Sequence, residues 1–140
     1  ERKRLLQHPK YFFFDVGVWN GLLGNFTVSS DRVGKLFEHF VFNQISAAAK
    51  ALDQDIRIST YRTEHSAEVD FIVEIKNNVF AIEVKASKNV GLRDLKGMDS
   101  FRSFYGKKFQ PIVISLNDLP KEINKIPILK WETALKVIFS

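Results

Sequence analysis

The feature that most constrains the fold is a pair of apolar strand segments, residues 69–75 and 79–86, separated by three residues. The connection Lys76-Asn77-Asn78 predicts a tight β-hairpin between them. In the second segment both alternating faces begin with apolar residues, which predicts a central strand covered on both sides. Helices are therefore expected on both faces of the sheet, as in α/β proteins.

The remaining elements follow from the spacing of apolar residues. Residues 33–52 form the clearest helix, because their apolar side chains recur on one arc of about 120°. A short helix is expected over 16–23 after Asp15 as its N-cap, and a basic amphipathic helix over 91–104 with Leu92, Leu95, Met98 and Phe101 inward. Further strands are expected at 11–14, 56–62 and 111–115, and a closing helix at 131–139. This order predicts an α/β (α+β) core of helix, three strands, helix and strand, with a central mixed sheet flanked by helices.

The length of 140 residues predicts one domain, which we place at residues 11–140. Residues 1–10 are polar and basic, as in a linker or the truncated edge of a longer chain. The absence of cysteine excludes disulfides, zinc–thiolate sites and thiol nucleophiles. No signal peptide or long apolar stretch is present, so we expect a cytoplasmic protein that makes no use of a membrane.

Three of the charged residues in the apolar strands are candidates for a functional site. Glu83 and Lys85 share one face of the third strand, and Asp70 lies in the second strand on the face opposite Val69 and Phe71. Buried carboxylates are costly unless they are paired, hydrogen-bonded or bound to metal. Counting outward from the hairpin turn places Asp70 and Glu83 nearly opposite each other, close enough for their side chains to converge.

Two converging carboxylates repel each other unless a divalent cation lies between them. A site with oxygen ligands and no His or Cys favours Mg²⁺ or Mn²⁺ over zinc. Glu38 lies at the edge of the apolar arc of the 33–52 helix. Its carboxylate is therefore expected to be half-buried in the apolar face of that helix. An exposed helix glutamate is the alternative interpretation of Glu38, and an exposed sheet pair is the alternative for Glu83 and Lys85.

The positive charge of the chain favours a polyanionic partner. Net charge is +5 and the pI is about 9.5, and nucleic acid is the commonest polyanion. Arg62, Ser87 and Lys88 flank the candidate site in sequence and are expected phosphate contacts; Arg62 is equally well explained as a partner of Glu68 or Glu74. Additional contacts without sequence preference are expected from Lys35, Arg93, Lys96 and Arg102.

The order of several motifs resembles known families. Asp70 followed by Glu83-Val84-Lys85, with Glu38 on a preceding helix, resembles the signature of the PD-(D/E)XK nuclease superfamily, whose core is restriction-endonuclease-like; Val69 stands where the motif has Pro. The longer pattern resembles the C-terminal module of a prokaryotic AAA+ ATPase family, domain of unknown function 4143. Its blocks here are Tyr11-Phe12-Phe13-Phe14-Asp15-Val16-Gly17, Gly34-Lys35-Leu36-Phe37-Glu38, Tyr61-Arg62-Thr63, Glu68-Val69-Asp70-Phe71 and Ala81-Ile82-Glu83-Val84-Lys85.

The resemblance implies a metal-dependent nuclease acting on DNA. It implies that Asp70, Glu83 and Glu38 hold the metal and that Lys85 positions or activates the attacking water. It further implies an N-terminal ATPase domain. That domain is expected outside this sequence, because no Gly-Lys-Ser/Thr motif occurs here. A homodimer is also implied, as in related junction-cutting enzymes. Two alternatives stay open: a catalytically inactive DNA-binding or protein-docking module, and a structural domain whose acidic cluster is a relic or a regulatory cation site.

Overall fold

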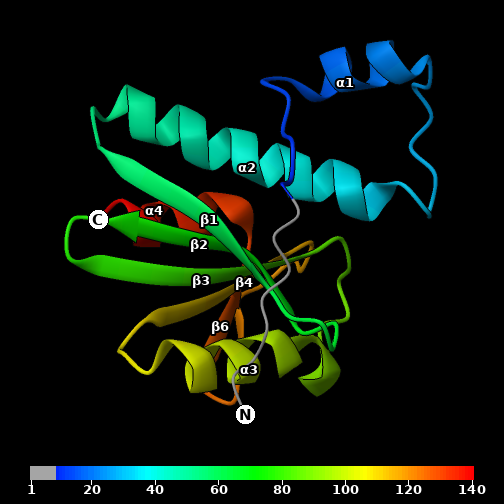
Figure 1. The fold of residues 1–140 in the computed structure, drawn as a ribbon. Helices are drawn as coiled ribbons and strands as arrows, with labels where there is room; N and C mark the ends of the chain where they lie inside the picture. Colours follow the sequence, from blue (N-terminus) through cyan, green and yellow to red (C-terminus); the bar gives the residue numbers. More distant parts are fainter. Residues whose placement is uncertain (1–8) are drawn as a thin grey trace.

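The computed structural model describes residues 9–140, which form an α/β fold of four α-helices and a six-stranded mixed sheet (Figure 1). Apart from Pro9 and Lys10, the predicted linker lies outside the described residues. No helix of the described part is long and apolar enough to cross a membrane. The elements in chain order are α1 (Val16–Leu23), α2 (Val33–Ala51), β1 (Ile56–Arg62), β2 (Glu68–Ile75), β3 (Asn78–Lys85), a 3₁₀ turn (Leu92–Leu95), α3 (Lys96–Tyr105), β4 (Gln110–Ser115), β5 (Lys121–Ile123), β6 (Ile126–Leu129) and α4 (Trp131–Ile138).

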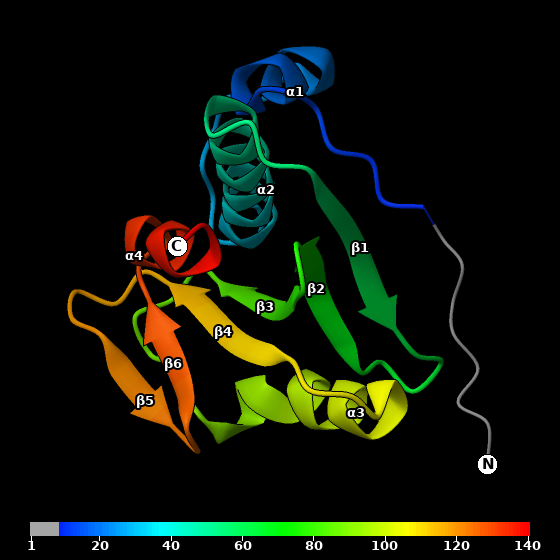
Figure 2. The same ribbon diagram turned by 90° about the vertical axis from the view of Figure 1, so that its left-hand side faces the viewer.

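The sheet has the strand order β1-β2-β3-β4-β6-β5. The first three strands are antiparallel neighbours, β3 pairs in parallel with β4, and β4 pairs in parallel with β6. In Figure 2, α2 and α4 lie over one face of the sheet and α3 lies over the other. The predicted central position of β3 is confirmed, because a strand borders it on each side and helices cover both faces.

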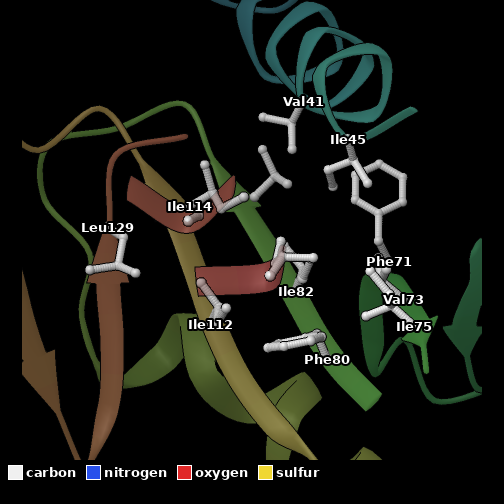
Figure 3. Packing of buried hydrophobic residues seen from close by; sticks show 13 residues of the cluster. Val41, Ile45, Phe71, Val73, Ile75, Phe80, Ile82, Ile112, Ile114 and Leu129 are labelled. Carbon is white, nitrogen blue, oxygen red and sulfur yellow. The ribbon is translucent and has the colours of Figure 1, made fainter. Parts of the chain in front are cut away.

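Two apolar clusters hold the three layers together. One joins α2 and α4 to the sheet, with Val41 and Ile45 of α2 packed toward Phe71 of β2 and Ile82 of β3 (Figure 3). The other lies under α3, where Met98 is fully buried. Each such side chain contributes about 1.5–3 kcal/mol when buried. The burial on both faces therefore fixes β3, which carries two of the predicted site residues, as a rigid element.

Local signals explain the ends of α1. The Asp15 side chain accepts a hydrogen bond from the Val18 N–H at 3.0 Å, and Gly24 ends the helix in the left-handed conformation. These are the predicted bounds. In contrast, the predicted strand at 11–14 is wrong, since this segment pairs with no strand. Residues 9–14, here called the N-terminal strap, pass beside β1 and reach α2 (Figure 2).

Two further expectations about the second half of the chain are wrong. Leu92 is 63% exposed because residues 92–95 form a 3₁₀ turn, which breaks the helical spacing that predicted it inward. The strands β5 and β6 were absent from the predicted core. They have three and four residues, too few to show a period of two in the sequence.

Candidate metal centre and its cleft

A cleft of about 580 Å³ opens where β2 begins and β3 ends. The N-terminal part of α2 and the first turn of α3 form its other walls. All four predicted catalytic side chains, Glu38, Asp70, Glu83 and Lys85, line this cleft. The sequence therefore brings one helix and two strands to a single polar concavity.

A β-bulge explains how Asp70 reaches the cleft. In the β1–β2 ladder Ser59 pairs with Ile72 and Tyr61 pairs with Val69, so two residues of β2 oppose the single residue between them on β1. Val69 and Ile72, three residues apart, consequently lie in the same cluster under α3. The predicted strict alternation of β2 is wrong at this point. Such a bulge re-aims a side chain, as bulges beside functional sites commonly do.

The Asp70 side chain accepts a hydrogen bond from the backbone of β3. The β2–β3 ladder continues from the turn as far as Phe71 opposite Ile82, and the next pair in that register is Asp70 and Glu83. There the Asp70 Oδ2 accepts a hydrogen bond from the backbone N–H of Val84 at 2.8 Å. The carboxylate is thus fixed at the place where the two strands stop pairing.

Glu83 is the most enclosed carboxylate of the cleft. Its side chain is 9% exposed, its Oε1 lies 2.8 Å from the Lys85 Nζ, and its Oε2 is buried without a hydrogen-bond partner among the described residues. Burial, followed by the charge of Asp70, raises the pKa of Glu83 to about 7. An orphaned buried oxygen normally has a partner such as water or an ion. This atom therefore marks a position suited to a cation.

Asp70 is the second carboxyl group of the cleft with a raised pKa. Burial and the charge of Glu38 raise the pKa of Asp70 to about 6, although the Val84 N–H opposes that rise. Two carboxyl groups with raised pKa values inside a cleft are typical of functional sites. The site gains free energy if a positive charge neutralises the pair.

Lys85 is an ammonium held by two acids. Burial alone would lower its pKa, but the hydrogen bond and charge of Glu83 raise the pKa above the ordinary value. The Asp94 Oδ1, at 4.0 Å, is the second acid, and the Asp94 Oδ2 accepts a bond from the Gly91 N–H at 2.9 Å. Lys85 therefore stays protonated near neutral pH.

The sequence interpretation missed Glu68, which lines the cleft, and Lys10, which contacts carboxylates of the cleft without lining it. The Lys10 Nζ lies 2.6 Å from the Glu68 Oε1, 3.0 Å from the Glu38 Oε1 and 3.9 Å from the Asp70 Oδ1. These bonds raise the pKa of Lys10, against the lowering effect of burial. Glu68 had a signal, since it stands two residues before Asp70 and therefore on the same side of a strand. No signal in the sequence indicated Lys10, because it lies in the predicted linker.

The predicted nucleic-acid contacts do not all reach the cleft. Lys35 lines it, together with Arg93 and Lys96. Arg62, Ser87 and Lys88 do not line it. The Arg62 Nε lies 3.8 Å from the Glu68 Oε2. Arg62 is therefore a partner of Glu68, as one of its two predicted roles had it. The Lys88 Nζ donates to Asp118 at 2.8 Å, and the Ser87 hydroxyl accepts the Asn89 N–H.

The donor set fits a hard divalent cation, although the side chains are not yet arranged around one. Within residues 9–140, no three His, Asp or Glu side chains form a group ready to hold a metal ion. The Lys10 ammonium lies between Glu38 and Asp70, and the Glu83 Oε1 is drawn to Lys85. The orphaned Glu83 Oε2 and the oxygen-only donors nevertheless suit Mg²⁺ or Mn²⁺.

Comparison with known proteins identifies the family. The family model described as domain of unknown function (DUF4143) matches residues 33–133. The chain belongs to this family. The matched part of the DUF4143 domain runs from the start of α2 into α4 and contains the four predicted catalytic residues and Glu68, whereas Lys10 lies outside it. The predicted resemblance to this family is confirmed. A search of curated proteins gave no match.

Proposed function

We propose that this DUF4143 domain is a metal-dependent nuclease of the PD-(D/E)XK type that hydrolyses phosphodiester bonds of DNA. The observation that carries the proposal is the buried Asp70–Glu83 pair, with one Glu83 oxygen orphaned and the Lys85 ammonium 2.8 Å from the other. Elsewhere in a protein such a pair would be costly and without benefit. In a polar cleft it is explained by a cation that both carboxylates bind.

Asp70 and Glu83 would hold Mg²⁺ or Mn²⁺, and Glu38 would complete the oxygen ligands from the side of α2. The ion supplies Lewis-acid chemistry, which polarises a phosphate oxygen and makes water more acidic. The Val84 N–H holds the Asp70 carboxylate in place through the bond to Oδ2. A ligand fixed by a second bond loses little entropy on binding metal.

Lys85 is assigned to charge stabilisation. A general base must be able to lose its proton near neutral pH, and the raised pKa of Lys85 opposes this. An ammonium in this place instead favours the negative charge that develops on a phosphate during cleavage. Of the two roles that the resemblance implied for Lys85, activation of the attacking water is the one that its raised pKa opposes.

DNA is the proposed substrate because cations surround the acidic floor of the cleft. Lys35, Arg93 and Lys96 line the same concavity as the carboxylates. Phosphates are bound by such side chains without sequence preference, while the carboxylate floor admits a phosphate only when metal neutralises it. DNA binding at the cleft should therefore require divalent cation and weaken with salt.

Lys85→Gln tests the assignment of roles. We expect nicking of supercoiled plasmid in Mg²⁺ to fall by about 100-fold or more, the usual effect of removing one charge-stabilising group. Mn²⁺ affinity should change by no more than a few-fold, because Lys85 engages the Glu83 Oε1 and leaves Oε2, the oxygen proposed for the ion, without a partner. Lys136→Gln, on the exposed side of α4 and away from the cleft, is the matched control and should nick like the wild type.

The alternative is a non-catalytic module that binds DNA or docks another domain. Asp70→Asn separates these possibilities in the same assay. A nuclease loses cleavage in this variant. A wild type that binds DNA in a salt-sensitive way without cutting it, and a variant that binds equally well, would indicate a DNA-binding module. Absence of both binding and cleavage would indicate a docking module.

A further inference from the structure

We propose that the Lys10 ammonium is a built-in counter-ion of the carboxylate cluster and that a divalent cation must displace it, so that the N-terminal strap inhibits its own metal site. This inference rests on the proposed function. It concerns a residue outside the matched family span and assigns that residue an autoinhibitory contact.

The geometry places Lys10 where a cation is needed. Its Nζ contacts carboxylate oxygens from two elements, Glu38 of α2 and Glu68 of β2, and lies 3.9 Å from the Asp70 Oδ1. Glu38, Glu68 and Asp70 all line the cleft. One ammonium therefore serves three acids that would otherwise repel each other. A divalent ion that binds Asp70 and Glu38 needs oxygens that Lys10 now engages.

The strap keeps the ammonium close to the cleft. Phe12 stacks on Phe42 with ring centroids 4.2 Å apart, and the Phe13 N–H donates to the His39 Nε2 at 2.8 Å. Both anchors lie within three residues of Lys10. A tethered group has a high effective concentration at its site, so the ammonium competes with metal for these oxygens.

Displacement needs only the Lys10 side chain to move. The side chain is a flexible four-carbon stem with its head in a partly exposed position, 27% accessible. The stacking of Phe12 on Phe42 and the hydrogen bond of the Phe13 N–H do not involve that stem. Metal entry is therefore an exchange of one cation for another inside a folded domain, without unfolding of the strap.

Calorimetric titration of Mn²⁺ into wild type, Lys10→Gln, Lys10→Arg and Lys136→Gln tests the proposal. We expect Lys10→Gln to bind Mn²⁺ about tenfold more tightly than the wild type, equivalent to about 1.4 kcal/mol. Lys10→Arg keeps the charge and should stay within about threefold of the wild type. Lys136→Gln removes one positive charge outside the cleft and should also bind like the wild type.

Thermal unfolding in EDTA gives a second readout that needs no metal and no activity. Lys10→Gln should melt below the wild type, because Glu38 and Asp70 lose a neighbouring positive charge and Glu68 keeps only Arg62. Saturating Mn²⁺ should remove the difference. Wild-type binding with an unchanged affinity in Lys10→Gln would overturn the inference and leave the proposed function standing. No Mn²⁺ binding by any of the four proteins would overturn the proposed function and the inference with it.

Discussion

Gly97→Ala is expected to destabilise the domain by about 3 kcal/mol or more. A Cβ at this position of α3 would lie only 1.8 Å from the backbone oxygen of Glu68 and 2.9 Å from its carbonyl carbon. Backbone atoms cannot rotate away as a side chain can, so α3 would have to move off β2 and open the cluster around Met98. Overpacking in a close-packed interior commonly costs 1–3 kcal/mol, and rigid neighbours raise that cost.

The measurement is urea denaturation of the variant beside Gly34→Ala. Gly34 lies in the first turn of α2, and a Cβ there meets nothing within 4 Å. Alanine is the better helix former, so Gly34→Ala should be neutral or stabilise by about 0.5–1 kcal/mol. If Gly97→Ala unfolded at the same urea concentration as the wild type, the close approach of α3 to β2 would be contradicted. Glu68 would then not be positioned by that contact.

Glu83→Gln is expected to have opposite effects in the presence and absence of metal. Metal affinity should fall about 100-fold, since an amide replaces a charged ligand. In EDTA at pH 8 the same variant should be more stable than the wild type by about 2 kcal/mol, because it removes a buried charge. The two effects have one cause, the burial of a charged carboxylate.

The pH dependence of this gain follows from the sign of the shift. Folding raises the pKa of Glu83 from 4.5 to about 7, so the folded chain keeps this proton at pH values where the unfolded chain has lost it. The wild type therefore loses stability as the pH rises from about 4.5 through about 7. The advantage of Glu83→Gln should be present at pH 8 and absent at pH 4.

Glu74→Gln is the matched control for this prediction. Glu74 lies on β2, with a side chain 45% exposed and paired at 4.0 Å with Arg57. An exposed pair of this kind contributes about 0–1 kcal/mol. Its removal should change stability little at either pH, with or without Mn²⁺. A stability gain in Glu74→Gln equal to that in Glu83→Gln would contradict the argument from burial.

The nearness of Asp70 to Glu83 was predictable because a short hairpin is a local structure. A turn between Ile75 and Asn78 fixes which residues face each other along both strands. The same reasoning predicted that β3 would be central, since apolar residues begin both of its faces. The hairpin thus brings Asp70 close to Glu83 and Lys85, and the helix period sets Glu38 at the edge of the apolar face of α2.

Other parts of the site depend on contacts that are distant in sequence. The bulge at Asp70 arises from pairing with β1, and no residue type in β2 marks it. Lys10 meets Glu68 across 58 positions of the chain, and no periodicity connects them. The family resemblance could not supply Lys10 either, because the matched residues begin at α2. A linker-like composition concealed a side chain that now lies among the acids of the cleft.

The most direct test of the central claim is calorimetric titration of Mn²⁺ into the wild type and Asp70→Asn at pH 7.5. Asn keeps the size of the side chain and an oxygen that can accept the Val84 N–H, so the fold should persist while one ligand charge is lost. We predict saturable binding by the wild type and at least about 100-fold weaker binding by the variant. Absence of binding by the wild type, or equal binding by both proteins, would contradict a metal centre at Asp70 and Glu83.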